Sequence, residues 1–194
     1  MSISAAPELG KRLRKKAERE LPEATLTCAR ALRRGREYQS AIGWYQALLR
    51  DYPGSRAAMS GRSELIATRV DSYAARAGKG KLPPPPVSGQ GASGSVEITI
   101  ANSSPEPLEL LFSGPATADS VRVPACGGCQ EVGSGAADSS SCSNAPSRTV
   151  RIKPGRYRTV ARAPGDESIK PYVGDWDLSS GYIYDDCYYI KRSS

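Results

Sequence analysis

Four consecutive prolines, residues 83–86, divide the sequence into two parts with different residue patterns. The prolines favour a stiff polyproline II rod, and the Gly- and Ser-rich residues after them favour a flexible chain. We therefore interpret residues 79–94 as a linker that joins a domain at residues 1–78 to a domain at residues 95–194. A proline-rich ligand for a groove of another protein is the alternative interpretation of this run.

The two parts also differ in charge. Residues 1–94 hold 17 of the 27 Lys and Arg residues and 8 of the 20 Asp and Glu residues, a net charge of +9. Residues 95–194 hold the other 10 basic and 12 acidic residues, a net charge of −2. The chain contains no histidine, which excludes histidine-based catalytic triads and histidine metal ligands. No catalytic glycine or serine motif occurs either, so we predict that the protein is not an enzyme.

No targeting or membrane-spanning segment is evident in the sequence. Residues 1–21 contain no apolar run of roughly 7–15 residues such as a signal peptide needs. No stretch approaches the ~18 consecutive apolar residues of a transmembrane helix. At face value this pattern predicts a cytoplasmic protein, whereas a real leader upstream of Met1 would place it outside the cytoplasm.

Apolar residues in the first part recur at helical spacing. Between residues 38 and 52 successive apolar residues fall one or three positions apart, on one face of a helix. A stripe over residues 26–32, which Pro22 opens, predicts a preceding helix. A third stripe over residues 66–77 predicts a following helix, for which Ser55 is the expected N-terminal cap.

The run GREYQSAIGWYQALLRDYPGS resembles the turn and second helix of a tetratricopeptide repeat. The residues that match the family's tyrosine, small alanine, aromatic, second small or apolar residue and closing proline are Tyr38, Ala41, Tyr45, Leu48 and Pro53. The resemblance covers residues 24–77, one repeat and a following helix. It departs from the family in one extra residue after Gly35 and in a leucine at position 48. A generic helical hairpin is the alternative interpretation.

The tetratricopeptide-like resemblance implies a groove that binds a protein partner or a second copy of the chain. We place three aromatic residues in that partner-binding region: Tyr38, Tyr45 and Tyr52. One repeat cannot bury its own faces, so the helical part needs further cover. Leucines and an alanine that recur every four residues in 9–21 form a narrow apolar stripe, which is a candidate for that cover.

The same N-terminal segment is strongly basic. Its charged run consists of Lys11, Arg12, Arg14, Lys15 and Lys16. No recognition motif or interleaved aromatic residue accompanies the run, so we predict no specific nucleic-acid binding. A solvated helix face is the simplest interpretation, and a weak contact with an anionic surface is the alternative.

The second part alternates apolar and polar residues over short segments. Val96, Ile98 and Ile100 alternate with Glu97 and Thr99, and similar patterns recur to the end of the chain. About seven such segments with turn residues between them predict an antiparallel β-sandwich. The fold class expected for the whole chain is therefore α+β in two parts, with N-terminal helical hairpins, a proline-rich linker and a C-terminal sandwich.

Two resemblances accompany this β-pattern. The segment TVRIKPGRYRTVARA resembles the Pro-Gly-x-Tyr hairpin of bacterial immunoglobulin-like and prealbumin-like modules. The second half as a whole is similar to a β-domain that accompanies tetratricopeptide-like segments in actinobacterial proteins of unknown function. That resemblance implies a module associated with the bacterial cell envelope, and it assigns no catalytic residue.

Four of the five cysteines lie in the predicted sandwich. They are Cys126, Cys129, Cys142 and Cys187, with the spacing C-x2-C-x12-C-x44-C. We prefer to interpret them as two disulfides. These bonds would hold the Gly- and Ser-rich loop between Cys129 and Cys142 against the sandwich. Four cysteines allow three connectivities. We favour one bridge from the Cys126/Cys129 turn to Cys142 and another from that turn to Cys187.

Two other interpretations of the cysteines stay open. A zinc site would use the same four thiolates, and the glycines of the C-G-G-C turn suit a zinc knuckle, although a second C-x2-C is missing. A redox dithiol would use Cys126 and Cys129 alone. The fifth cysteine, Cys28, has apolar helical spacing and is predicted to be a small buried residue.

The cysteine interpretations carry the prediction of compartment. Disulfides require an oxidising compartment, which favours an extracytoplasmic protein, whereas zinc suits a cytoplasmic one. Without zinc, the sequence calls for no cofactor.

The leading functional hypothesis is a non-enzymatic interaction or scaffold protein. A thiol redox protein is one alternative. A carbohydrate-binding module of the cell envelope is the other, and it would use the tyrosine-rich strands near the C-terminus. The aromatic residues of that candidate surface are Tyr172, Trp176, Tyr182, Tyr184, Tyr188 and Tyr189.

Overall fold

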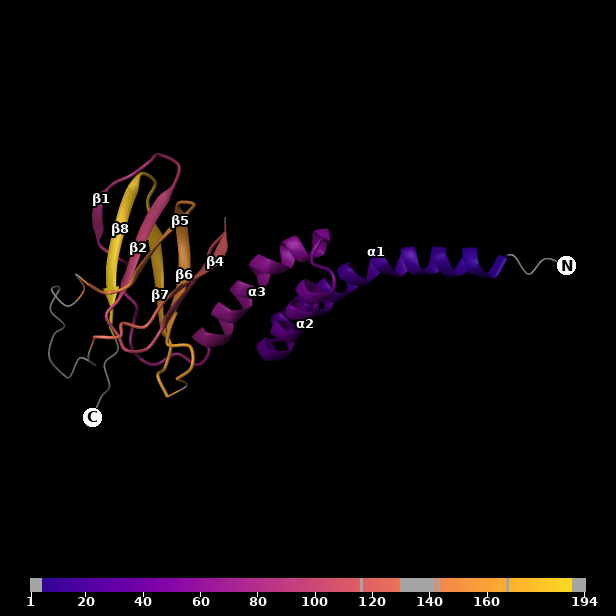
Figure 1. Cartoon of the computed structure of the whole chain (residues 1–194), viewed down its shortest axis with the longest axis horizontal. Helices are drawn as coiled ribbons and strands as arrows, with labels where there is room; N and C mark the ends of the chain where they lie inside the picture. Colours follow the sequence, from indigo (N-terminus) through magenta and orange to yellow (C-terminus); the bar gives the residue numbers. More distant parts are fainter. Residues whose placement is uncertain (1–4, 116, 130–141, 143, 167, 190–194) are drawn as a thin grey trace. The chain divides into compact units, whose positions relative to one another are not determined.

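The protein consists of helices followed by β-strands (Figure 1). The computed structural model describes residues 5–115, 117–129, 142, 144–166 and 168–189, and it describes side chains from residue 10 onward. In these residues three helices precede eight strands, which form two four-stranded sheets. The prediction of an α+β chain, helical first and then a sandwich, is confirmed. The chain divides into a helical unit, Met1–Arg69, and a sandwich unit, Val70–Ser194.

The helical unit is built from α1 (Ala5–Arg34), α2 (Tyr38–Asp51) and most of α3 (Arg56–Ala74). We expected Pro22 to open a separate helix, and this expectation is wrong, since α1 runs through it. The Pro22 ring is buried. The proline lacks the amide that would bond to the Glu18 carbonyl oxygen, one turn earlier. In the turn that follows, the hydroxyl of Thr25 donates a hydrogen bond to the Leu21 carbonyl oxygen at 2.8 Å.

Small residues allow the three helices to pack closely. The core of the helical unit consists of Leu26, Ala29, Ala41, Tyr45, Leu48, Ala57 and Ala58. A Cβ atom on Gly61 of α3 would lie 2.9 Å from a methyl carbon of Leu48, so the glycine is required by this packing. Ser55 caps α3, as predicted, because its hydroxyl oxygen accepts a hydrogen bond from the Ala58 amide at 3.1 Å.

Eight strands form the sandwich unit. One sheet has the order β1-β8-β2-β5 and the other the order β4-β3-β6-β7. The strands are β1 (Val87–Gln90), β2 (Val96–Asn102), β3 (Leu108–Ser113), β4 (Ala118–Val123), β5 (Ser147–Ile152), β6 (Gly155–Arg162), β7 (Tyr172–Leu178) and β8 (Tyr182–Tyr188). The expectation of purely antiparallel pairing is wrong for one pair, because β2 and β8 run parallel. Their parallel pairing brings the C-terminal ends of both strands to the same end of the sandwich.

The core lies between the two sheets, where alternate residues of each strand meet. Val96, Ile98 and Ile100 of β2 are fully buried, as their alternation predicts. They share one cluster with Phe112 of β3 and Trp176 of β7. The rings of the last two residues lie 5.7 Å apart between centroids, in a tilted arrangement.

The segment predicted to be a linker contributes to the sandwich, which corrects that prediction. Leu82 is buried in the core, and its amide donates a hydrogen bond to the Val173 carbonyl oxygen at 2.9 Å. Its own carbonyl oxygen lies so close to Gly174 that a Cβ atom there would collide with it. β1, which ends at Gln90, adds an edge strand to β8. The four prolines, residues 83–86, end directly before β1, so the β8 ladder needs no amide hydrogen from them.

Candidate functional site

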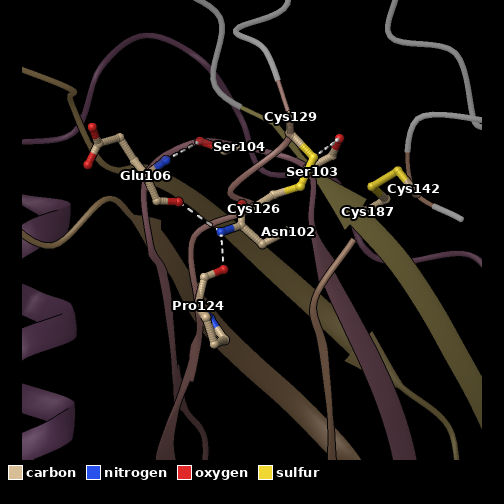
Figure 2. The surroundings of a disulfide bond; sticks show 9 residues. All are labelled: Asn102, Ser103, Ser104, Glu106, Pro124, Cys126, Cys129, Cys142 and Cys187. Atoms are coloured by element: carbon tan, nitrogen blue, oxygen red, sulfur yellow. Dashed lines mark hydrogen bonds between the residues drawn. A yellow bond between two sulfur atoms is a disulfide. The ribbon is translucent and has the colours of Figure 1, made fainter. Parts of the chain in front are cut away.

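One end of the sandwich gathers the four cysteines of the second part (Figure 2). Cys187 lies in β8 opposite Ala101 of β2. Cys142 precedes β5, which begins at this end, and Cys126 and Cys129 follow β4, which ends there. Residues that are far apart in sequence therefore meet because β2, β4 and β8 all end on one side.

The cysteines pair as two disulfides, Cys126–Cys129 and Cys142–Cys187 (Figure 2). The Cα atoms of the first pair lie 5.3 Å apart and those of the second pair 6.2 Å apart. The favoured connectivity, in which the C-G-G-C turn bonds to Cys142 and to Cys187, is wrong. The chain turns tightly between Cys126 and Cys129, where the Cys129 amide donates a hydrogen bond to the Cys126 carbonyl oxygen at 3.2 Å. This turn places the two sulfurs of the C-G-G-C segment within bonding distance of each other.

The two disulfides differ in what they can do for stability. Cys142–Cys187 spans 45 positions, so it removes about 4 kcal/mol of loop-closure entropy from the unfolded chain. Cys126–Cys129 spans only 3 positions, and the same relation gives about 2 kcal/mol. The long-range disulfide is thus the main covalent staple of the sandwich, and the short one is less needed for that purpose.

Buried polar groups hold the turn that carries the short disulfide. The side-chain amide of Asn102 donates hydrogen bonds to the carbonyl oxygens of Glu106 and Pro124, both at 2.8 Å. The Cys126 amide donates to the Ser104 carbonyl oxygen at 2.8 Å. These contacts fix the turn through the end of β2 (Figure 2). Sequence reasoning missed this polar support, for which the only signal is a run of short polar residues directly after an alternating strand.

Ser103 joins the surroundings of both disulfides. Its amide donates a hydrogen bond to the carbonyl oxygen of Tyr188, the residue after Cys187. Its hydroxyl donates to the sulfur of Cys129 at 3.6 Å (Figure 2). Ser103 is almost completely buried, so this hydroxyl is held beside the sulfur by the fold.

A carboxyl group lies beside the long-range disulfide. The Asp186 carboxylate accepts a hydrogen bond from the Cys187 amide at 2.8 Å. Burial raises the pKa of Asp186, and the hydrogen bond from the Cys187 amide offsets part of that rise.

The zinc alternative does not fit this sulfur arrangement. A four-cysteine zinc site needs four thiolates around one point. Here each of the four sulfurs is bonded to another sulfur. Within the described part of the chain, no group of three or more cysteine or carboxylate residues is arranged to hold a metal ion.

A buried carboxylate lies where β3 and β6 pair near the same end. Glu109 of β3 is 1% exposed, and its carboxylate contacts Arg122 of β4 at 3.1 Å and Arg162 of β6 at 3.6 Å. The Arg162 guanidinium also lies over the ring of Tyr73 in α3, 4.6 Å from its centroid, and donates a hydrogen bond to the Tyr73 hydroxyl. The contacts of Arg162 with Tyr73 attach the end of α3 to the outer face of this sheet. The two arginines balance the negative charge of Glu109, which allows its carboxylate to be buried.

The C-terminal aromatic residues do not form one exposed face. Trp176 and Tyr184 are buried in the core, and Tyr188 packs against it. Tyr172 and Tyr182 are exposed, but they belong to β7 and β8, which lie in different sheets. Tyr189 follows the end of β8 and is half-buried. The carbohydrate-binding alternative therefore loses the surface on which it was based.

The predicted partner-binding tyrosines are not a shared surface either. Tyr45 is completely buried in the core of the helical unit, which corrects its assignment as a partner-binding residue. Tyr52 packs against the same core, and Tyr38 is half-buried. The regular spacing that suggested a partner surface reflects the face that α2 buries.

The basic run lies on an exposed helix. Every described residue of α1 from Gly10 to Leu21 is exposed, including the cations at positions 11, 12, 14, 15 and 16. Leu13 is 59% exposed and Leu21 is 48% exposed. The expectation that this stripe covers the helical hairpin is therefore wrong, since α1 packs only through the part that contains Leu26 and Ala29.

Cys28 is exposed on α1 and is not bonded to another cysteine, so the prediction of a buried residue is wrong. Leu26 lies two positions earlier and Ala29 one position later, and both are buried. Two positions correspond to about 200° around an α-helix, which turns Cys28 away from the side that Leu26 buries.

A partly exposed ion pair joins two helices of the helical unit. Arg30 donates a hydrogen bond to the Glu64 carboxylate at 2.9 Å, and the Tyr45 hydroxyl donates to it at 3.0 Å. The hydrogen bond from Arg30 lowers the pKa of Glu64, although burial opposes this. Burial and the neighbouring carboxylate raise the pKa of Tyr45 to about 12.

We expect the stability of the helical unit to depend on Glu64 ionisation. The pKa of Glu64 is lowered in the folded state. Its contribution to the free energy of unfolding is therefore complete above the ordinary carboxyl pKa, and it is lost as the pH falls through the lowered pKa of the folded state. The Glu64→Gln variant should lose about 1 kcal/mol at neutral pH, since the pair is partly screened. It should also show a flatter acid dependence, measured by urea unfolding with circular dichroism at 222 nm. Glu20→Gln, an exposed change on α1, is the control, and an equal acid dependence in both variants would contradict the assignment.

No helix in the described residues is long and apolar enough to cross a membrane. Comparison of the chain with protein families, with curated proteins and with solved structures finds no match.

Proposed function

We propose that the protein is a non-enzymatic interaction protein, in which the helical unit binds a protein partner and the sandwich is a disulfide-stapled module. The observation that carries this proposal is that every residue of α1 from Gly10 to Leu21 is exposed. Most helical stability in proteins comes from the packing of one helix face, which this part of α1 lacks. A partner that covers this part of α1 would supply the missing contacts.

The chemistry of the exposed segment favours an acidic protein surface as the partner. Residues 10–21 contain six basic and two acidic side chains, a net charge of +4. Leu13, Ala17 and Leu21 recur every four residues and provide an apolar stripe between the charges. A stripe without aromatic residues is a poor membrane anchor, and the run has no aromatic residue for stacking on bases.

The packing of the helical unit supports a tetratricopeptide-like arrangement of residues 24–77. A short turn joins the second half of α1 to α2, which buries Ala41, Tyr45 and Leu48. Pro53 follows Tyr52, the C-cap residue of α2, and α3 begins three residues later at Arg56. These are the positions on which the sequence resemblance rests.

The two four-stranded sheets support an immunoglobulin-like or prealbumin-like sandwich. The first two strands, β1 and β2, share one sheet, and β2 pairs in parallel with the last strand, β8. The membership in an actinobacterial envelope-associated group remains part of this proposal.

The two disulfides support an oxidising compartment as the place where the protein acts. The long-range disulfide gives the sandwich covalent stability that a reducing cytoplasm would remove. We include an extracytoplasmic location in the proposal on this ground.

Site-specific photo-crosslinking in the cells that make the protein tests the partner proposal. A benzophenone amino acid in place of Leu13 or Leu21 should give one discrete protein adduct at each position, because both side chains are exposed on the proposed binding surface. The double change Lys15→Glu and Lys16→Glu should abolish the adduct, since it lowers the net charge of residues 10–21 from +4 to zero. Mass spectrometry of the adduct identifies the partner, and an adduct of twice the chain mass indicates a second copy.

The matched control places the same amino acid at Arg148, an exposed position on β5. No adduct, an adduct that survives the charge reversal, or an equal pattern at position 148 would contradict the proposal. An adduct with nucleic acid or lipid in place of protein would also contradict it.

A further inference from the structure

We propose that Cys126 and Cys129 form a reversible thiol–disulfide exchange site that reacts with dithiols or disulfides of other proteins. Cys129 is the sulfur that exchanges with the substrate, and Cys126 is the resolving sulfur. This activity goes beyond partner binding by the helical unit and does not depend on it.

The two sulfurs differ in access. Cys126 is 8% exposed and belongs to the buried residues of the sandwich unit, whereas Cys129 is only half-buried. Gly127 and Gly128 between them are exposed, and a Cβ atom on either glycine would meet no heavy atom within 4 Å. A substrate chain can therefore approach the turn closely from the side of Cys129.

The polar surroundings also distinguish Cys129. The Ser103 hydroxyl donates a hydrogen bond to its sulfur at 3.6 Å (Figure 2). After reduction, a hydroxyl held at this position stabilises the thiolate over the thiol, which lowers the pKa of a cysteine and increases its reactive fraction.

The turn keeps its shape without the sulfur–sulfur bond. The Cys126 amide bonds to Ser104, the Cys129 amide bonds to Cys126, and Asn102 holds Pro124. None of these hydrogen bonds uses a sulfur atom. Opening the Cys126–Cys129 bond therefore leaves the two thiols close together, ready to close again, while Cys142–Cys187 keeps the sandwich stapled.

The reaction balances with a protein dithiol as the co-reactant. A substrate thiolate attacks the Cys129 sulfur, a substrate–Cys129 disulfide forms, and the Cys126–Cys129 bond breaks. Cys126 leaves as a thiolate and takes a proton from solvent. The second substrate thiol loses its proton and attacks the first substrate sulfur, which releases the Cys129 thiolate. The substrate dithiol has then been oxidised to a disulfide and the protein disulfide reduced by two electrons; the reverse sequence reduces a substrate disulfide.

A titration of the full chain in glutathione redox buffers tests the proposal without any substitution. After equilibration, free thiols are alkylated and located by peptide mass spectrometry. Cys126 and Cys129 should become alkylated at glutathione ratios at which Cys142 and Cys187 remain linked. The exposed Cys28 should be alkylated throughout, which verifies the labelling. If both disulfides open together, or if the short one opens only on unfolding, the proposal is overturned.

Single-thiol variants then test the roles of the two sulfurs. In a Cys28→Ser background, Cys126→Ser leaves Cys129 and Cys129→Ser leaves Cys126, with Cys142–Cys187 intact. Because thiolate access and pKa control the rate, Cys129 should react with Ellman's reagent about tenfold faster than Cys126. Equal rates, or a faster Cys126, would overturn the assignment.

The pH dependence of the Cys129 reaction tests whether the Ser103 hydroxyl stabilises the Cys129 thiolate. The pH midpoint of the Cys129 reaction should move upward when Ser103→Ala is added to the Cys126→Ser variant, because the hydroxyl no longer stabilises the thiolate. Ser104→Ala, which alters the neighbouring residue but leaves the Ser103 hydroxyl, should leave this midpoint unchanged. Circular dichroism verifies that each variant is folded, and an unchanged midpoint in a folded Ser103→Ala protein removes Ser103 from the proposal.

Discussion

Replacing Cys142 and Cys187 together with alanine is expected to lower the free energy of unfolding of the sandwich by about 4 kcal/mol. The bond between these residues closes a segment of 45 positions and joins β8 to the chain before β5. Without it, the unfolded chain regains the entropy of that loop. The Cys126–Cys129 bond closes only 3 positions, so replacing both of its cysteines with alanine should lower the free energy of unfolding by about 2 kcal/mol.

Urea unfolding followed by tryptophan fluorescence measures this difference. The chain has two tryptophans, of which Trp176 is buried in the sandwich and Trp44 is exposed on α2. A Trp44→Phe background therefore makes the fluorescence report on the sandwich alone. If the double alanine variant at Cys126 and Cys129 loses as much free energy of unfolding as the variant at Cys142 and Cys187, or more, the long-range bond is not the main staple.

The second large effect is expected for Trp176→Ala. Trp176 is 1% exposed and packs against Phe112 between the two sheets. Its ring nitrogen donates a hydrogen bond to the Leu82 carbonyl oxygen at 3.4 Å, which attaches the proline-rich segment to the core. Removing the ring leaves a cavity and an unpaired carbonyl, so the free energy of unfolding should fall by about 3–5 kcal/mol.

Near-ultraviolet circular dichroism of the buried tyrosines follows urea unfolding in this variant, since the buried tryptophan is gone. Asp175→Ala, one position earlier on β7 and exposed on the opposite side of the strand, is the control and should change stability by less than about 1 kcal/mol. A Trp176→Ala loss as small as that of the control would mean that β7 does not pack as described.

The sequence predicts the core strands well because their side chains decide the structure locally. Val96, Ile98 and Ile100 alternate with polar residues, and the alternation alone defines which face of β2 is buried. β1 escapes prediction because residues 87–90 contain only one large apolar side chain, and that one is exposed. Its strand conformation depends on the hydrogen bonds that β8 offers, which no local pattern records.

The cysteine pairing is harder to predict because it depends on where strands end. Cys187 meets Cys142 only because β2 and β8 run parallel and finish at one end of the sandwich. The parallel pairing has no signature in the sequence of either strand. Likewise, Ser103 lies beside Cys129 through the path of the chain after β2, although 26 positions separate the two residues.

The helical periodicity of the sequence predicts α2, but it does not show whether the apolar face of α2 packs in the core or binds a partner. The spacing of Tyr38, Tyr45 and Tyr52 is compatible with a partner surface and with a core, and the structure uses it for the core. The distinction depends on Ala57 and Ala58 of α3, which pack against the same side. The partner-binding region that we propose lies instead on the part of α1 from Gly10 to Leu21, whose residues are all exposed.

The central claim is that the four cysteines of the sandwich pair as Cys126–Cys129 and Cys142–Cys187. Peptide mapping of the non-reduced protein tests it, provided that free thiols are alkylated before digestion. Trypsin alone leaves three of the cysteines in the peptide 123–148, so a second cleavage after Glu131 is needed to separate Cys129 from Cys142.

The double digestion should release the peptide 123–131 with an internal disulfide, two hydrogens lighter than its dithiol form. The peptide 132–148 should appear joined to the peptide 168–191, which contains Cys187. A disulfide between 123–131 and either of the other two peptides, or alkylation of all four cysteines in the native protein, would contradict the account.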